Sequence, residues 1–198
     1  MPAKTPPPPV ASASTPKRDL LLDTAFRLFY QDGYHAVGID RILAEAGLAK
    51  MTLYHHFASK EELIVAALDR RGAAIEAALA EAMAKAGSAP RKRLAAFFAW
   101  HEAWVRGDDF NGCAFIRAVG EYPELSSAVH QVVVRRKEAS RALLTTLLAA
   151  AGLAGAPRLA AQIQLLLEGA IVTAHTSGDP AAITLAIEAA NTLIEAGR

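Results

Sequence analysis

The sequence predicts an all-α protein of about nine helices, and two observations carry this prediction. Apolar residues recur at the i, i+3, i+4 spacing of helices through most of the 198 residues, and no segment of any length alternates with period two. Glycine and proline signals separate the periodic segments. The hydrophobic content of 53% is enough for a sizeable core, so we expect one or two domains.

The chain begins with a segment that has little to bury, followed by the first helix. Residues 1–14 are rich in proline, alanine and serine, and we expect a disordered tail there. The first helix is expected from Thr15 to about Asp32, because Thr15 can cap orphan amides and Pro16 has no amide to leave unpaired. Gly33 is a natural C-terminal stop. The apolar stripe of this helix contains Leu21, Leu22, Ala25, Phe26, Leu28 and Phe29.

Two short helices are predicted next, at Ile39–Ala46 and Lys50–Phe57, separated only by the letters GLA. A connection this short forces the two helices to cross. Gly47 can adopt the positive φ that ends the first of them, and Leu48 can turn back into the shared core. The pattern therefore predicts a helix-turn-helix.

A longer helix should follow, from the letters SKEE to about Lys85, before Gly87. Ser59 and Glu62 have the spacing of a capping box, in which the hydroxyl and the carboxylate each accept from amides at the helix start.

The remainder of the chain is predicted to be helical as well, with glycine or proline at the boundaries. The clearest boundary is SGDP, where Gly178 can close one helix and Asp179 can cap the next. The expected helices are Pro90–Arg106, Gly112–Glu121, Glu124–Ala151, Pro157–Thr176 and Pro180–Ala196.

The helix at Lys50–Phe57 has a polar outer face. On a helical wheel Leu53 and Phe57 fall on the same side and should face the core. The outer face then centres on Met51 and His55. In a helix-turn-helix the second helix lies in the major groove, where outward side chains meet base edges and edge residues meet phosphates. Thr52 and Tyr54 flank this outer face, and Lys50 and His56 lie nearer its edges.

Residues 17–68 resemble the DNA-binding domain of the TetR family of transcriptional regulators. The resemblance rests on LFYQDGY, AGLAKMTLYHHF and SKEEL at the family's spacing. It implies an N-terminal helix-turn-helix domain over residues 15–64 and a helical effector-binding and dimerisation domain over residues 65–198. By matching position it implies phosphate contacts from Tyr54, His56 and Lys60, base reading by Thr52 and His55, and further contacts from Lys50 and Met51.

Two positions depart from the family's pattern. Gly38 and Ala49 stand where many members have serine or threonine caps. Alanine is a poor cap and loses about 1 kcal/mol, so we expect the start of the Lys50–Phe57 helix to fray until DNA orders it.

The adjacent histidines allow other readings. As metal ligands they are poorly placed, because neighbouring helix residues point about 100° apart and His55 and His56 cannot share one ion without a third ligand. His56 can also be a purely structural residue at the helix edge.

Charge and cysteine content limit how the protein can bind DNA and in which compartment it is expected. Formal net charge is only +1, and residues 1–60 carry seven basic and five acidic side chains, so DNA affinity must rely on placed contacts and dimerisation. The single cysteine, Cys113, excludes an intrachain disulfide and fits a reducing cytoplasm. No secretory signal is expected, and the longest mostly apolar run, residues 142–156, is too short for a membrane span.

An effector pocket is expected around the helix that begins at Pro90. His101 interrupts an apolar stripe there, either as a core histidine bonded to a neighbour or as a polar anchor for a ligand. The predicted pocket residues are Phe97, Trp100, His101, Trp104, Phe110, Cys113, Ile116 and Tyr122, with Arg117, Glu121, His130 and Glu168 as further polar candidates.

The last two helices carry little charge on any face, which predicts that they pair with a second copy. We therefore expect a homodimeric, ligand-responsive regulator, a repressor by resemblance, that binds a palindromic operator and is released by a small-molecule effector. The alternative is a helical ligand-binding or adaptor protein without DNA binding. An enzyme is not expected, since HExxH, a phosphate loop, a nucleophile elbow and paired carboxylates are all missing, and no cofactor is predicted.

Overall fold

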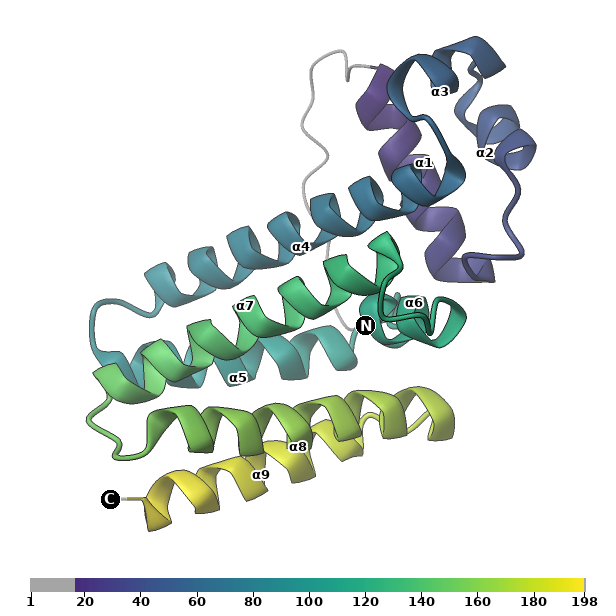
Figure 1. The fold of residues 1–198 in the computed structure, drawn as a ribbon. Helices are drawn as coiled ribbons and strands as arrows, with labels where there is room; N and C mark the ends of the chain where they lie inside the picture. The colour runs from purple at the N-terminus through teal and green to yellow at the C-terminus, as the bar shows by residue number, and fades with distance from the viewer. Residues whose placement is uncertain (1–16, 198) are drawn as a thin grey trace. The chain divides into compact units, whose positions relative to one another are not determined.

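The computed structural model describes residues 17–197, which form nine helices and no strand (Figure 1). The all-α prediction is confirmed; the expected tail and the Thr15 cap lie outside the described residues. The helices are α1 (Lys17–Asp32), α2 (Ile39–Ala46), α3 (Lys50–His56), α4 (Lys60–Lys85), α5 (Pro90–Val105), α6 (Ala114–Glu121), α7 (Ala128–Ala150), α8 (Ala156–Ser177) and α9 (Ala181–Ala196).

The described chain forms two compact units. One combines residues 17–75 with Ala114–Arg136, and the other combines Glu76–Cys113 with residues 137–197. The unit that holds the helix-turn-helix thus extends beyond residues 15–64 to include α6 and the start of α7. Helices α4 and α7 each contribute residues to both units.

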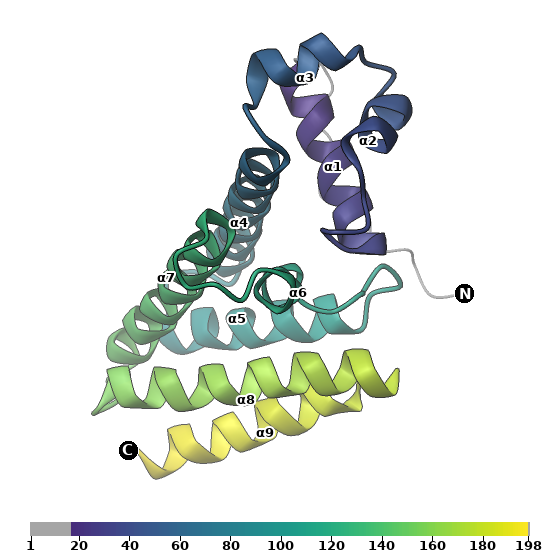
Figure 2. The same cartoon turned by 45° about the vertical axis from the view of Figure 1, so that its right-hand side comes forward.

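In the first unit α1 packs against both α2 and α3 (Figure 2). Gly47 has a φ of 65°, and the Leu48 amide donates to the Leu43 carbonyl oxygen, so the α2–α3 turn forms as expected. Burial of the apolar stripe of α1 against both short helices holds this turn in place. The stripe residues buried there are Leu21, Leu22, Ala25, Leu28 and Phe29.

Side chains at the helix starts confirm two predictions and correct one boundary. Ser59 Oγ accepts from the Glu62 amide at 3.1 Å, and a Glu62 carboxylate oxygen accepts from the Ala58 amide at 2.7 Å. Asp179 Oδ1 accepts from the Ala181 amide at 2.8 Å. The helix predicted from Glu124 begins only at Ala128, because Ser127 Oγ accepts from the Val129 amide and supplies the cap.

The second unit is built on α5, α8, α9 and parts of α4 and α7. Helices α8 and α9 run antiparallel and side by side in both views (Figures 1 and 2), joined by a turn in which Gly178 has a φ of 70°. The buried residues of α8 include Ile163, Leu167 and Ile171, and those of α9 are Ile183, Ala186, Ala190 and Ile194.

Candidate nucleic-acid interface and ligand pocket

Helix α3 is held by its apolar side and exposes its polar side. Leu53 and Phe57 are almost fully buried, at 0% and 2% exposure, whereas Met51 is 79% exposed and Tyr54 46%. His55 is exposed as well. The orientation follows from the sequence, since a seven-residue helix with two large apolar residues four apart can bury only that side.

The start of α3 lacks a side-chain cap, as expected. Ala49 and Gly38 make no side-chain cap hydrogen bond. Lys50 lies in this first turn, and its Nζ is 3.4 Å from Asp40 Oδ1 on α2, at an exposed pair that contributes little.

The other predicted DNA-binding residues differ in exposure and in the contacts that their side chains make. The rings of His55 and His56 meet edge to face at 4.9 Å, with His56 half-buried and Thr52 partly covered. Lys60 is also partly buried, and its Nζ donates to the His35 carbonyl oxygen at 3.1 Å. Burial lowers the pKa of Lys60, and the Glu121 carboxylate opposes this.

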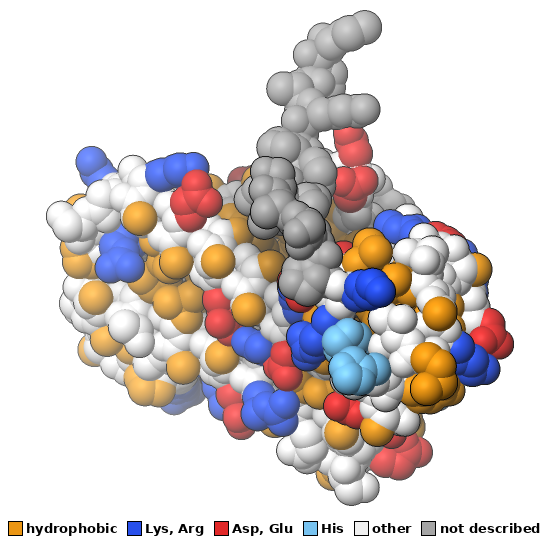
Figure 3. All heavy atoms as spheres, turned by 90° about the horizontal axis from the view of Figure 1, so that it is seen from above, with side chains coloured by type: hydrophobic (Ala, Val, Ile, Leu, Met, Phe, Trp, Pro, Cys, Tyr) orange, Lys and Arg blue, Asp and Glu red, His pale blue; other side chains and the backbone are white. Residues whose placement is uncertain are grey.

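On the face shown in Figure 3 the lysine and arginine side chains do not gather in one patch. Over the atoms that are not grey, they are scattered among acidic, hydrophobic and neutral groups. Several arginines of the first unit are paired, including Arg41 with Asp32 and Arg70 with both Asp19 and Asp23. Any affinity for a polyanion must therefore come from placed contacts.

Sequence reasoning named Glu121 as a polar candidate but missed its partners. This residue at the end of α6 binds the α1–α2 turn: its Oε1 accepts from the Tyr34 amide at 2.9 Å and its Oε2 from the His35 amide at 2.6 Å. The His35 ring stacks on Tyr122 at 4.6 Å, and Tyr34 donates its hydroxyl to the Ala114 carbonyl oxygen. These contacts fix α6 and Tyr122 to the α1–α2 turn.

We expect Glu121→Ala to lower the free energy of unfolding by about 1–3 kcal/mol, since two backbone amides lose a charged acceptor. Glu121→Gln, which keeps one oxygen, should fall between the variant and wild type. Urea denaturation measures the effect, and exposed Glu124→Ala is the matched control, expected within about 0.5 kcal/mol of wild type. Equal stability of the two alanine variants would contradict the role given to Glu121.

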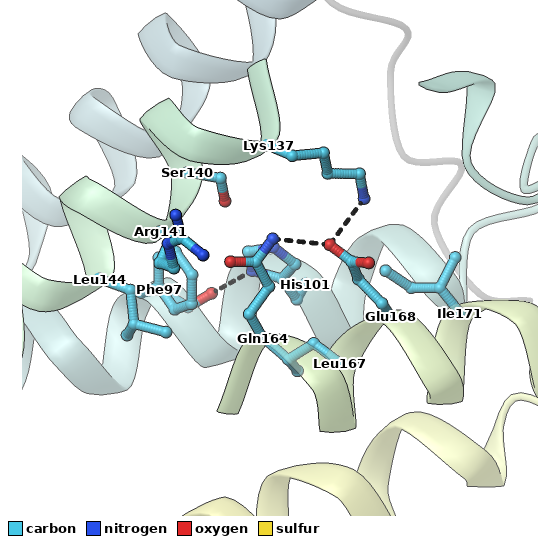
Figure 4. Close-up of a pocket in the computed structure, with 10 residues that line it drawn as sticks. All are labelled: Phe97, His101, Lys137, Ser140, Arg141, Leu144, Gln164, Leu167, Glu168 and Ile171. Atoms are coloured by element: carbon cyan, nitrogen blue, oxygen red, sulfur yellow. Dashed lines mark hydrogen bonds and ion pairs between the residues drawn. The ribbon is translucent and has the colours of Figure 1, made fainter. Parts of the chain in front are cut away.

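The second unit contains a small cavity of about 50 Å³ between α5, α7 and α8 (Figure 4). Its polar side chains are linked: Lys137 Nζ lies 3.1 Å from Glu168 Oε1, and Gln164 Nε2 donates to the same oxygen at 2.8 Å. The residues lining the cavity are Phe97, His101, Lys137, Ser140, Arg141, Leu144, Gln164, Leu167, Glu168 and Ile171.

His101 is a core histidine bonded to a neighbour, and it also lines the cavity. It is buried, its Nδ1 is 2.9 Å from the Phe97 carbonyl oxygen, and its ring lines the cavity. Burial lowers the pKa of His101 to about 4; the Phe97 hydrogen bond opposes the shift and the charge of Lys137 adds to it. The imidazole is therefore neutral near pH 7, with its proton on Nδ1.

The pKa of His101 predicts a loss of stability in acid. Between its ordinary value of 6.5 and about 4, the unfolded chain binds a proton that the folded chain excludes. The free energy of unfolding should therefore decrease as the pH falls through this range, by about 1.4 kcal/mol per pH unit from this residue. Urea denaturation from pH 7 to pH 4 should give a shallower slope for His101→Phe than for wild type, and parallel slopes would contradict the prediction.

The predicted pocket residues do not all meet. Phe97 and His101 line the cavity of Figure 4, whereas Phe110 lines a second, more open hollow of about 260 Å³ with Val105, Arg106 and His175 among others. Trp100, Trp104 and Phe110 form a series of ring contacts at 6.1 and 5.3 Å. The linings of the two hollows do not include Trp100, Trp104 and the buried Cys113, while Ile116 and Tyr122 belong to the helix-turn-helix unit.

Most of the cavity lining was not predicted. Of the residues on α7 and α8 that line it, the sequence singled out only Glu168. A usable signal existed: Gln164 and Glu168 stand four apart between apolar positions of α8, where polar residues interrupt a buried stripe.

The fold and the exposed face of α3 define a helix-turn-helix protein, and comparison with known proteins gives its family. The model described as bacterial regulatory proteins, tetR family, matches residues 21–67. A TetR-family transcriptional regulator from Streptomyces coelicolor is 31% identical, with a TM-score of 0.84 over 91% of this chain and 95% of that one. The chain belongs to the TetR family of transcriptional regulators.

Other similar proteins are also named as transcriptional regulators. The crystal structure of reduced Escherichia coli NemR is 25% identical, with a TM-score of 0.78 over 89% of this chain and 96% of that one. Its sequence, named a transcriptional repressor, is 28% identical over 65% of each chain. The transcriptional activator FasR of Mycolicibacterium smegmatis is 48% identical over 27% of this chain and 25% of its own length. The chain thus spans between a quarter and two thirds of these two curated relatives.

The helices of residues 17–197 were also compared with the length and apolarity that a membrane span requires. Within this range no helix meets both conditions.

Proposed function

We propose that this regulator represses transcription as a homodimer bound to a roughly palindromic operator, and that a small-molecule effector releases it. The observation that carries the proposal is the orientation of α3, which buries Leu53 and Phe57 and presents Met51 and His55 outward. An outward, donor-bearing face on the second helix of a helix-turn-helix is suited to the major groove. The protein acts in the cytoplasm and carries out no catalysis.

The contacts with DNA are assigned by position on α3 and at the start of α4. His55 and Thr52 read base edges, with Lys50 and Met51 as further contacts. Tyr54, His56 and Lys60 bind phosphates. For Lys60 this requires the ammonium to leave the His35 carbonyl oxygen, a short movement of a flexible side chain.

Dimerisation is assigned to α8 and α9 because each leaves large apolar side chains in water. Leu165 is 73% exposed, Leu185 65% and Val172 43%. If a two-fold axis passes through this surface, these side chains are buried in both copies of the dimer. The two copies of α3 would then meet half-sites about 34–36 Å apart, or a multiple of this distance.

The effector response is assigned to a change in the balance between two dimer conformations. An effector that prefers one conformation 100-fold supplies about 2.7 kcal/mol, which is enough to shift a modestly biased equilibrium. Helices α4 and α7 are the connecting elements, since each contributes residues to both units.

Selection of duplexes from a random pool by the purified full chain tests the proposal. The selected sites should contain an inverted repeat, and the logarithm of the binding constant should fall with the logarithm of salt concentration by about 0.9 per phosphate neutralised. Enrichment of no sequence, with no salt-dependent binding to any duplex, would favour a helical ligand-binding or adaptor protein instead.

A further inference from the structure

The cavity of Figure 4 contains a hydrogen-bond acceptor whose orientation is fixed by its own side chain. Gln164 Nε2 donates to Glu168 Oε1 at 2.8 Å, an interaction that only the amide nitrogen can make with a carboxylate. The amide oxygen therefore points elsewhere. This Oε1 atom is buried and has no hydrogen-bond partner, the one such side-chain atom among the described residues. A buried acceptor without a donor is unfavourable and calls for an explanation.

A second acceptor lines the same cavity. The Nδ1–H of His101 is directed to the Phe97 carbonyl oxygen at 2.9 Å, so Nε2 of the neutral ring carries a lone pair. Among residues 17–197 no hydrogen bond to this Nε2 atom is formed. The two acceptors come from different helices, α5 and α8, and both belong to residues that line one cavity.

The rest of the lining limits what can supply the donors. Lys137 and Arg141 carry positive charge and Glu168 carries one negative charge, which is already shared between Lys137 and Gln164. A cationic donor would meet net positive charge here, so a neutral donor is favoured. Apolar walls complete the site and suit a short alkyl group; they are Phe97, Leu144, Leu167 and Ile171.

The size of the cavity sets the size of the group that enters. Its volume of about 50 Å³ exceeds the roughly 10–15 Å³ that one water needs and is well below the roughly 300 Å³ of a drug-sized site. It suits an amide or hydroxyl group together with a few carbon atoms.

We propose that this cavity binds a small neutral molecule bearing amide N–H or hydroxyl donors, which donate to Gln164 Oε1 and His101 Nε2. The inference rests on the proposed function only in naming this molecule the effector. Binding at this place has a direct route to the other unit through α7: the cavity residue Lys137 follows Arg136, whose guanidinium donates to the Asp69 carboxylate on α4 at 2.8 Å.

Matched pairs of probes on the DNA-free full chain test the chemistry. Acetamide and 2-propanol, which carry a donor, are each compared with acetone, which has the same number of heavy atoms and no donor, by calorimetry at pH 7. Each donor should bind about tenfold or more tightly than its partner without the donor, because buried acceptors reject an analogue that leaves them unpaired. In ¹⁵N spectra the donor probes should shift the Nε2 resonance of His101. If the donors do not bind, or each pair binds equally, the proposal is overturned.

Two variants locate the site. Gln164→Met removes one of the two acceptors with little change in volume and should reduce the preference for acetamide over acetone. Gln162→Met, at a partly buried glutamine of the same helix outside the cavity lining, should retain it. An unchanged preference in Gln164→Met would overturn the assignment. If Gln164→Met does not fold, His101→Phe and the wild-type resonance shift decide the question in the same way.

The last step separates this inference from the proposed function. Operator binding is measured with and without acetamide at a saturating concentration. Tight, donor-selective binding that leaves operator affinity unchanged would support the site and refute its role as the effector site. Failure of the chain to bind any duplex would refute the proposed function while the calorimetry still decides on the ligand.

Discussion

Leu185→Glu is expected to separate the dimer and to weaken operator binding by about 100-fold or more, because a monomer loses the effective concentration that joins two half-sites. Leu185 is 65% exposed on α9 and is one of the exposed apolar residues of the proposed interface. Removing two copies of a leucine that each contribute about 2 kcal/mol weakens dimerisation by about 1,000-fold, before the cost of burying a carboxylate is added.

Sedimentation equilibrium and operator titration measure the two effects on the same protein. Leu125→Glu is the matched control, since Leu125 is 72% exposed but lies before α7, outside α8 and α9. The control should remain dimeric. A dimeric Leu185→Glu protein would mean that the two copies associate through another surface.

Tyr54→Ala and His55→Ala are expected to weaken DNA binding in two different ways. Because Tyr54 is proposed to bind phosphate, Tyr54→Ala should reduce the affinity for every duplex by a similar factor. The factor should be about 100-fold or more, since both half-sites lose a hydrogen bond to a charged group. Because His55 is proposed to read a base edge, His55→Ala should instead change the preference for the base at one or two positions of the operator, by about 1–3 kcal/mol each. Both side chains are exposed, so stability should change little.

The two variants are measured against a panel of single-base operator variants, with Gln31→Ala, an exposed residue on α1, as control. A change of sequence preference in Tyr54→Ala would show that its role and that of His55 are misassigned. Unchanged affinity in both would place the DNA contact on another surface.

Helix positions were predictable because their signals are local. The capping box at Ser59 and Glu62 and the positive φ of Gly47 each depend on residues within one turn. The predicted start of α7 came too early because it rested on the proline signal at Pro123, whereas Ser127, a preferred N-cap residue, caps the helix in the structure.

The orientation of α3 was also predictable, whereas the cavity was not. Leu53 and Phe57 are large apolar residues on one side of a short helix, so hydrophobic burial leaves one arrangement. The cavity depends on which polar residue of α8 stands opposite His101 of α5, and this is a matter of helix packing that no local pattern specifies.

The sequence by itself determined the order of the helices, the caps at Ser59 and Asp179, the outward face of α3 and the resemblance to a family, since each depends on periodicity or on residues close together in the chain. Only the tertiary structure decided that Glu121 of α6 holds the Tyr34 and His35 amides, 87 and 86 residues away, and that Gln164 and His101 line one cavity. The physical reason is that hydrogen-bond partners and cavity walls are selected by packing of whole helices, which brings distant residues together through the combined burial of many side chains.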